Sequence, residues 1–324
     1  MKRWLLALWL VPLGGCGDSG PAGPSTVSRD LSAPATSFGF VAGTSLSFVS
    51  GETGQPVPGA RVVIAGRDFI SDGAGRVLLS ELAPNGATVD IQATGFLDRK
   101  TLVRRGEVTT FELWPSESPT RMDANYSRAL VYDSATLEST GAAEPMDRPS
   151  LDTPRVALIP DGVLAGDQRA MVALRSAALE ITDALRGEIT YNVGDDPSAM
   201  PVALMVEPEN TQIVSENLRA LTRCWRTRLV ITRCEIIFRS VEVARSDTAL
   251  HELGHTFGLN HSPDRREIMG VRRLAAPERF SPRERLAMAM MLKRLPGNLF
   301  PDNDRQAPAL RASPNVSTVV CRHP

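Results

Sequence analysis

Eleven consecutive residues constrain this chain more than any other part of its sequence. Residues 251–261 read HELGHTFGLNH and contain three of the four histidines. Residues four apart in a helix share one face, so His251 and His255 can direct two imidazoles at one metal ion. Gly258, one turn later, can adopt a left-handed conformation that ends the helix and redirects the chain, so that His261 supplies a third nitrogen. We therefore expect a helix, a turn and a metal site.

The chemistry of this donor set indicates a catalytic rather than a structural metal. Three neutral nitrogen ligands and one open position are typical of catalytic zinc sites, whereas structural sites fill all four positions and often use cysteine. Zinc lowers the pKa of a bound water to about 7. Glu252, directly after the first histidine, can accept the proton of that water and pass it to a leaving amine. The sequence predicts one catalytic Zn²⁺ with Glu252 as general base. A three-histidine site that holds metal without catalysis is the alternative, and Glu252 argues against it.

These residues, together with Ile268-Met269-Gly270, resemble the metzincin family of zinc metalloproteases. The family motif HExxHxxGxxH is matched at every defined position, and Met269 stands where the family has its Met-turn. Ser262 and the eight-residue step from His261 to Met269 are most similar to the matrixin type. The resemblance implies a zinc ion held by the three histidines, a methionine floor beneath their imidazoles, and endopeptidase activity on a protein or peptide substrate.

The resemblance also implies where the substrate lies. In metzincins an antiparallel edge strand above the metal pairs with extended substrate, as in strand addition generally. We expect that strand within residues 228–240, which carry several arginines. Those arginines favour either acidic peptides or, as we prefer, a solvated edge protected from aggregation. Matrixins are kept latent by a propeptide thiol, and this route is not expected here because Cys16 is the only cysteine before the domain.

The remaining sequence predicts a multidomain chain, with an all-β sandwich followed by an α/β (α+β) protease domain. In residues 39–115, short apolar strands alternate with turns, and the order GQPVPGARVVI, DGAGRVLL, DIQATGFLDR resembles prealbumin-like, carboxypeptidase-regulatory domains. Residues 116–154 are expected to form a linker and the start of the catalytic domain, with a strand at 129–132. The protease domain is expected at 155–300 and a C-terminal tail at 301–324.

Individual elements are also expected within the two units. The strands expected in the sandwich are 45–49, 60–64, 76–79, 88–93 and 109–113, and those expected in the second unit are 155–159, 189–193 and 202–206. Helices are expected at 167–186, from an N-cap at Ser246 into the histidines, and from a capping box of Ser281 and Glu284 with Pro282 at the first position.

The N-terminus is typical of an exported protein. Lys2 and Arg3 precede an apolar run at residues 4–13, which is too short to span a bilayer. The following Gly14-Gly15-Cys16 resembles a bacterial lipobox, in which Cys16 is lipidated and becomes the new N-terminus; an ordinary secretory signal is the alternative. Residues 17–38, rich in Gly, Pro, Ser and Thr, are expected to be a flexible tether. We expect a protein anchored by lipid to the cell envelope, at the outer membrane or cell surface.

Cysteines and charge narrow the chemistry further. Export places the thiols in an oxidising compartment. Cys224 and Cys234 can form a disulfide if a tight turn separates them, whereas a straight strand would hold them beyond the ~7 Å limit. The state of Cys321 is left open. The chain has 36 Lys+Arg and 37 Asp+Glu, for a net charge of −1. Nucleic-acid-binding proteins normally have an excess of basic residues, so we expect no nucleic-acid partner.

Two other functions compete with a zinc endopeptidase. One is a surface lipoprotein that binds or adheres through its β-sandwich and has a weak or inactive metal domain. The other is a zinc peptidase that acts only on short or cell-wall peptides. We favour the endopeptidase because a degenerate site usually loses its general base first, and Glu252 is present.

Overall fold

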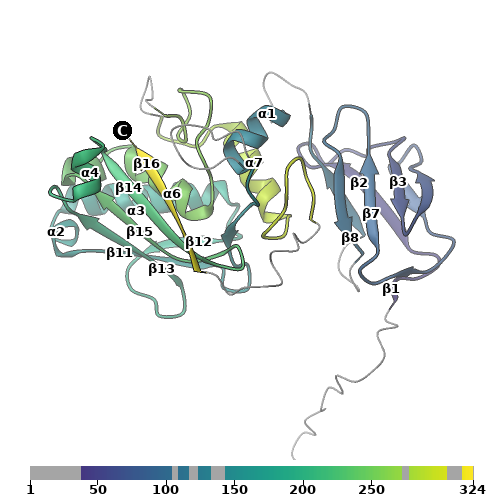
Figure 1. The fold of residues 1–324 in the computed structure, drawn as a ribbon, viewed down its shortest axis with the longest axis horizontal. Coiled ribbons are helices and arrows are strands. Elements are labelled where there is room, and N and C mark those ends of the chain that lie inside the picture. Colours follow the sequence, from purple (N-terminus) through teal and green to yellow (C-terminus); the bar gives the residue numbers. More distant parts are fainter. Residues whose placement is uncertain are drawn as a thin grey trace, which may run out of the picture. The chain divides into compact units, whose positions relative to one another are not determined.

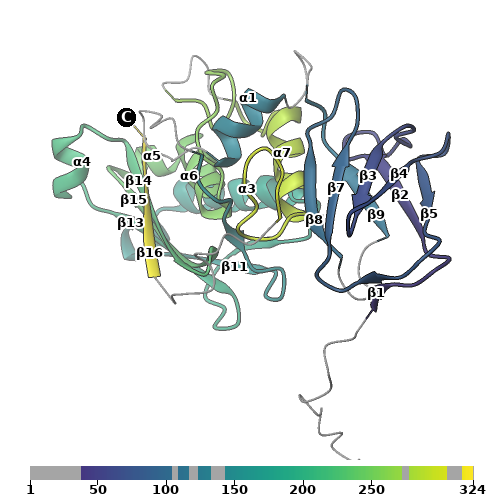
Figure 2. The same ribbon diagram turned by 45° about the vertical axis from the view of Figure 1, so that its right-hand side comes forward.

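A computed structural model describes residues 38–103, 109–116, 123–132, 143–271, 277–304 and 316–323 (Figures 1 and 2). The export signal with Cys16 and nearly all of the expected tether lie outside these residues, and the first strand begins at Phe38. No helix in the described part of the chain is long and apolar enough to cross a membrane.

Residues 38–113 form three sheets around a core of their own. The strands are β1 (Phe38–Phe40), β2 (Ser45–Ser50), β3 (Arg61–Ile64), β4 (Arg67–Ile70), β5 (Arg76–Leu78), β6 (Ala83–Pro84), β7 (Thr88–Gln92), β8 (Arg99–Leu102) and β9 (Thr110–Leu113). They form the sheets β5-β2-β9, β4-β3-β7-β8 and β1-β6. Every second residue of β2 is buried, and the rings of Phe48 and Phe111 stack 5.4 Å apart. This alternation is the signal by which the sequence predicts strands here.

The second unit is built on one seven-stranded sheet. Its strands are β10 (Arg148–Pro149), β11 (Arg155–Pro160), β12 (Thr190–Val193), β13 (Met200–Val206), β14 (Ala220–Thr227), β15 (Val230–Phe238) and β16 (Val316–His323). Their order is β12-β11-β13-β15-β14-β16, with β10 beside β15. Strands β10 to β13 and β15 are parallel, and β14 runs antiparallel to β15.

Helices of different lengths accompany this sheet. They are α1 (Ala124–Ser127), η1 (Arg128–Tyr132), α2 (Gly162–Ala165), α3 (Gln168–Ala184), α4 (Thr211–Ser215), α5 (Val241–Ala244), α6 (Thr248–Phe257) and α7 (Pro282–Leu292). The start of α3 is fixed by Asp167, whose carboxylate accepts from the Ala170 amide at 2.7 Å. Its apolar face, with Leu174 and Ile181, is fully buried in the core that also contains α6. The expected helix at 167–186 is confirmed.

The strand expected at 129–132 is wrong, because these residues are helical. Asp123 caps α1, and the chain continues without a break into the π-helical turn η1. Tyr126 and Leu130, four residues apart, are both buried, as one face of a helix requires. The Leu130 carbonyl accepts from the amide of Asn260 at 2.8 Å, which ties this turn to the segment that follows α6.

The edge strand expected within residues 228–240 is also wrong. That segment begins at the turn of a hairpin and continues as β15, which lies between β13 and β14 and therefore has no free edge. The turn residues Arg228 and Leu229 both have left-handed backbones, with φ of 52° and 62°. Two-residue hairpin turns need this conformation and usually obtain it from Gly or Asn, so the sequence carries no signal for the turn. The hairpin places Cys224 opposite Cys234, and a disulfide joins them.

Part of the expected C-terminal tail belongs to the sheet. Residues 316–323 form β16, which pairs antiparallel with β14 from Thr227↔Val316 to Ala220↔His323. The run VSTVV at its start is rich in β-branched residues, which favour strands where a sheet edge is open to them. The folded domain therefore extends beyond residue 300, where the sequence analysis expected it to end.

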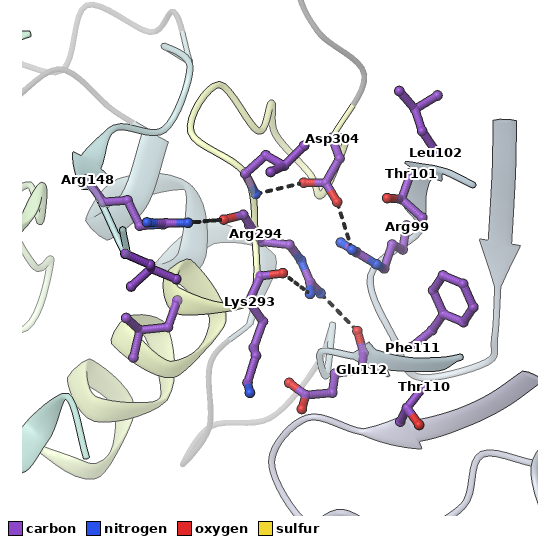
Figure 3. Close-up of a pocket in the computed structure, with 13 residues that line it drawn as sticks. Arg99, Thr101, Leu102, Thr110, Phe111, Glu112, Arg148, Lys293, Arg294 and Asp304 are labelled. Carbon is purple, nitrogen blue, oxygen red and sulfur yellow. Dashed lines mark hydrogen bonds and ion pairs between the residues drawn. The ribbon is translucent and has the colours of Figure 1, made fainter. Parts of the chain in front are cut away.

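A buried cluster of charges joins β8 to the segment after α7 (Figure 3). The Arg99 guanidinium donates to Asp302 at 2.9 Å and to Asp304 at 2.7 Å. Arg294 donates to Asp302 at 2.7 Å and to the backbone carbonyl of Glu112 at 2.9 Å. Both arginines and both aspartates are buried. Such pairs contribute little net stability when complete, but removing one partner leaves an uncompensated buried charge.

Replacing Arg99 should therefore destabilise the protein far more than replacing an exposed arginine of the same unit. We expect Arg99→Ala to lower the free energy of unfolding by about 3–5 kcal/mol, because Asp304 loses its cationic partner. The control is Arg61→Ala, since Arg61 pairs with Asp68 at 2.8 Å on the surface, where a pair is worth at most about 1 kcal/mol. Urea unfolding measures both, and equal losses would contradict this account.

Candidate metal centre

Helix α6 carries three of the residues singled out in the sequence, and all ten of its residues are buried. Its start differs slightly from the expectation. The N-cap position is Asp247, which makes no side-chain capping bond, and the hydroxyl of Ser246 accepts from the Thr248 amide at 3.2 Å instead. The expected cap residue therefore acts one position further from the helix.

The helix ends at Gly258, as the sequence predicts. Gly258 has a left-handed backbone with φ of 105°, and its amide bonds to the carbonyls of Gly254 and His255. A Cβ at this position would lie 2.2 Å from the carbonyl oxygen of Asp147, so no larger residue fits. This turn brings the chain back toward the helix, and His261 lies beside the two helical histidines.

The three imidazoles converge. One ring nitrogen of each lies within 4.8 Å of those of the other two, and the Nε2 atoms of His251 and His255 are 3.1 Å apart. The Nδ1 atoms of both rings point to backbone carbonyls, of Ile268 at 2.6 Å and of Leu259 at 2.7 Å. A carbonyl only accepts, so each Nδ1 carries a proton, and Nε2 is the ring atom that faces the shared space.

His261 completes a donor set that fits a metal cation. Both of its ring nitrogens are buried without a hydrogen-bond partner, and burial lowers its pKa to about 4, so the ring is neutral at pH 7. Ligands of a tetrahedral zinc ion lie roughly 3.3 Å apart, close to the His251–His255 separation. Within the described residues, these histidines are the cluster that could hold a metal ion.

Glu252 lies beside this cluster and is fully buried. The hydroxyl of Thr222, on β14, donates to its Oε2. This hydrogen bond fixes the orientation of the carboxylate. The contact also places the middle of β14 next to the metal centre, which sequence reasoning missed because Thr222 lies thirty residues from Glu252 and belongs to no motif.

Met269 packs against the helix at the one position without a side chain. A Cβ on Gly254 would lie 2.3 Å from the Met269 Sδ, so this glycine permits the close approach. Met269 is fully buried. Its amide donates to Oε1 of Glu284 at 2.7 Å, and Oε2 of the same carboxylate accepts from the Ser281 amide at 2.7 Å. The predicted capping box of α7 therefore also holds the turn around Met269.

A second carboxylate, that of Glu267, holds the loop between His261 and Met269. It accepts from the hydroxyls of Tyr126 at 2.8 Å, of Ser281 at 2.7 Å and of Ser262, the residue directly after His261. Arg283 donates to it at 3.2 Å. Sequence reasoning missed Tyr126 and Glu267, because neither lies in a recognisable pattern, and it assigned Glu284 to helix capping alone.

Comparisons with known proteins add little to this geometry. No family model and no curated protein sequence matches the chain. A solved structure described as "Structure of CpGH84D" is similar over 33% of this chain and 18% of its own length, with 10% sequence identity and a TM-score of 0.20. The chain thus spans under a fifth of that protein, and so low a score supports no conclusion about fold or function.

The carboxylate of Glu284, which accepts from the Met269 amide, should make the stability of the protein depend on pH. Burial raises the pKa of Glu284 to about 7 from 4.5. Between these values the folded state binds the proton that the unfolded state has released, so the stabilising contribution is complete below pH 4.5 and is lost as the pH rises through about 7. The stability of the parent relative to Glu284→Gln should therefore fall over this range by up to about 3 kcal/mol. Urea unfolding of the metal-free proteins measures it, and parallel pH profiles would contradict it.

Proposed function

We propose that this protein is a zinc-dependent endopeptidase of the metzincin type. The observation that carries the proposal is the convergence of the His251, His255 and His261 imidazoles beside the fully buried carboxylate of Glu252 on α6. The match to HExxHxxGxxH, the left-handed turn at Gly258 and the buried Met269 beneath the helix support it.

Each residue then has a distinct task. His251, His255 and His261 would hold the ion, and the carbonyls of Ile268 and Leu259 fix the orientation of the first two rings. Zinc supplies a Lewis acid that lowers the pKa of a bound water to about 7. Glu252 takes a proton from water and delivers it to the leaving amine, while Thr222 holds one of its oxygens in place. Met269 fills the space beneath the helix and keeps water from it.

The substrate on this proposal is an extended protein or peptide chain. β14 is the antiparallel strand whose residue Thr222 contacts Glu252, and strand addition to its outer edge would bring a peptide bond to the metal centre. This replaces the earlier assignment to residues 228–240. The alternative function, a metal-holding surface protein that binds through the β-sandwich, has the same metal content but no hydrolysis.

Two substitutions separate catalysis from metal binding. Glu252→Ala should retain zinc and lose about 10²–10⁴-fold in peptide-bond cleavage, because the carboxylate is not needed to hold the ion. His255→Ala should lose zinc and cleavage together. Glu242→Ala, at an exposed glutamate on α5, is the control and should match the parent.

Zinc content by mass spectrometry and digestion of casein and of a peptide library give the readouts. Parental cleavage by Glu252→Ala would show that the mechanism is wrong. A parent that holds zinc but cleaves no protein or peptide would favour the binding protein, and cleavage of short peptides alone would favour the small-peptide peptidase.

We also propose that the protein is exported and anchored by lipid at Cys16 in the cell envelope. The support is the sequence at residues 1–16. Cys16→Ser should move the protein from the membrane fraction to the soluble fraction, because the acyl chains provide the apolar attachment. Immunoblots of fractionated cells measure the distribution. If the variant stays with the membranes, the lipid anchor is refuted.

A further inference from the structure

We infer that the C-terminal strand β16 occupies the edge of β14 along which a peptide substrate would lie, so that the chain's own C-terminus competes with substrate. This inference rests on the proposed function for its consequence, but the strand pairing on which it depends can be measured separately.

The outer edge of β14 is occupied along its whole length. Its inner edge pairs with β15, and its outer edge pairs with β16, in register from Ala220↔His323 to Thr227↔Val316. Both views show β16 as the last strand of the sheet, directly beside β14 (Figures 1 and 2). A second extended chain therefore finds no free backbone groups on β14.

The strand whose outer edge is occupied also contacts the residue proposed as general base. Thr222 donates its hydroxyl to Glu252, and the register places Cys321 directly opposite Thr222. On the proposed function, β16 therefore occupies the register position beside Thr222 that an added substrate strand would take. It runs antiparallel to β14.

The ladder alternation identifies which backbone groups of β14 face β16. The amide of Arg239 donates to the carbonyl of Arg219 at 2.9 Å, so Arg219 directs its backbone groups at β15. Bonded and non-bonded pairs alternate along an antiparallel ladder, so Thr222 and Cys224 direct theirs at β16. The Cα atoms of Cys224 and Cys234 are 4.1 Å apart. So short a separation is typical of a pair that exchanges no backbone hydrogen bonds, which agrees with Cys224 directing its backbone groups away from β15.

The same alternation separates two neighbouring valines of the tail. Val319 lies opposite Cys224, so its amide is directed at β14. Val320 lies opposite Arg223, so its amide points away from β14, to the outer side of the last strand. Proline has no amide hydrogen, and a strand tolerates it only where that hydrogen is not needed. The two positions therefore provide a matched pair of substitutions.

Covalent attachment favours the tail over a free peptide. β16 and β14 belong to the same chain, so their pairing is intramolecular, and an intramolecular partner can reach an effective concentration on the order of millimolar. A peptide substrate at micromolar concentration then competes poorly for the same edge, and removal of the tail should release the activity.

The test compares the full chain with four variants. One ends at residue 315, and the others are Val319→Pro, Val320→Pro and Cys321→Ser. Hydrogen exchange reports the pairing without any need for activity. The amides of Thr222 and Cys224 should exchange at least about tenfold faster in the truncated chain and in Val319→Pro, whereas Val320→Pro and Cys321→Ser should stay near the parent.

Cleavage of a peptide library by the zinc-loaded proteins gives the second readout. The truncated chain and Val319→Pro should gain at least about tenfold in kcat/KM, mainly through a lower KM, and a synthetic peptide of residues 316–323 should inhibit the truncated chain.

Each contrary result has a distinct meaning. Equal exchange in the full and truncated chains would overturn the inference and leave the proposed function intact. Release of cleavage by Cys321→Ser as large as that by truncation would also overturn it, because the thiol and not the strand would then be the inhibitor. Faster exchange with unchanged kcat/KM would show that this edge is not where substrate binds. If no variant cleaves any peptide, the proposed function itself fails.

Discussion

The convergence of the three histidines depends on the left-handed turn at Gly258. A helix alone can present His251 and His255 on one face, but a third ligand must come from a chain that reverses direction within three residues. The turn is fixed from outside as well, because the carbonyl of Asp147 lies where a Cβ would be. Gly254 adds a second close approach on the same helix and admits Met269. Gly254 within α6 and Gly258 at its C-terminal end thus decide whether Met269 and His261 can approach the helix.

The protonation and hydrogen bonding of the histidines also fit a site that could hold a metal cation. Burial lowers the pKa of His261 to about 4, and the carbonyls of Ile268 and Leu259 accept from Nδ1 of the other two rings, whose Nε2 atoms lie 3.1 Å apart. Glu252 is fully buried, and the hydroxyl of Thr222 donates to its carboxylate. Ring nitrogens of this kind are ligands for a divalent cation such as Zn²⁺. Glu267 and Glu284 instead hold the surrounding loops through hydrogen bonds.

Local patterns predicted much of this molecule, and the failures have identifiable causes. Residues 251–261 and the capping box at Ser281 combine short spacing with specific side-chain chemistry, so the helix ends and the histidine cluster could be predicted. The hairpin at Arg228 and Leu229 could not, because neither residue favours the conformation it adopts. β16 was missed because its pairing with β14 joins segments about ninety residues apart in sequence, which no local pattern reveals. The contacts of Glu252 with Thr222 and of Glu267 with Tyr126 join residues remote in sequence, which no local pattern reveals.

X-ray absorption spectroscopy of the zinc-loaded full-length protein tests the central claim most directly. The account predicts one zinc ion per chain, with three imidazole nitrogens at about 2.0–2.1 Å, a single further oxygen ligand and no sulfur. His261→Ala should reduce the imidazole signal by one third. A shell with fewer than three imidazoles would contradict the proposed donor set, and a sulfur ligand at about 2.3 Å would contradict the open fourth position.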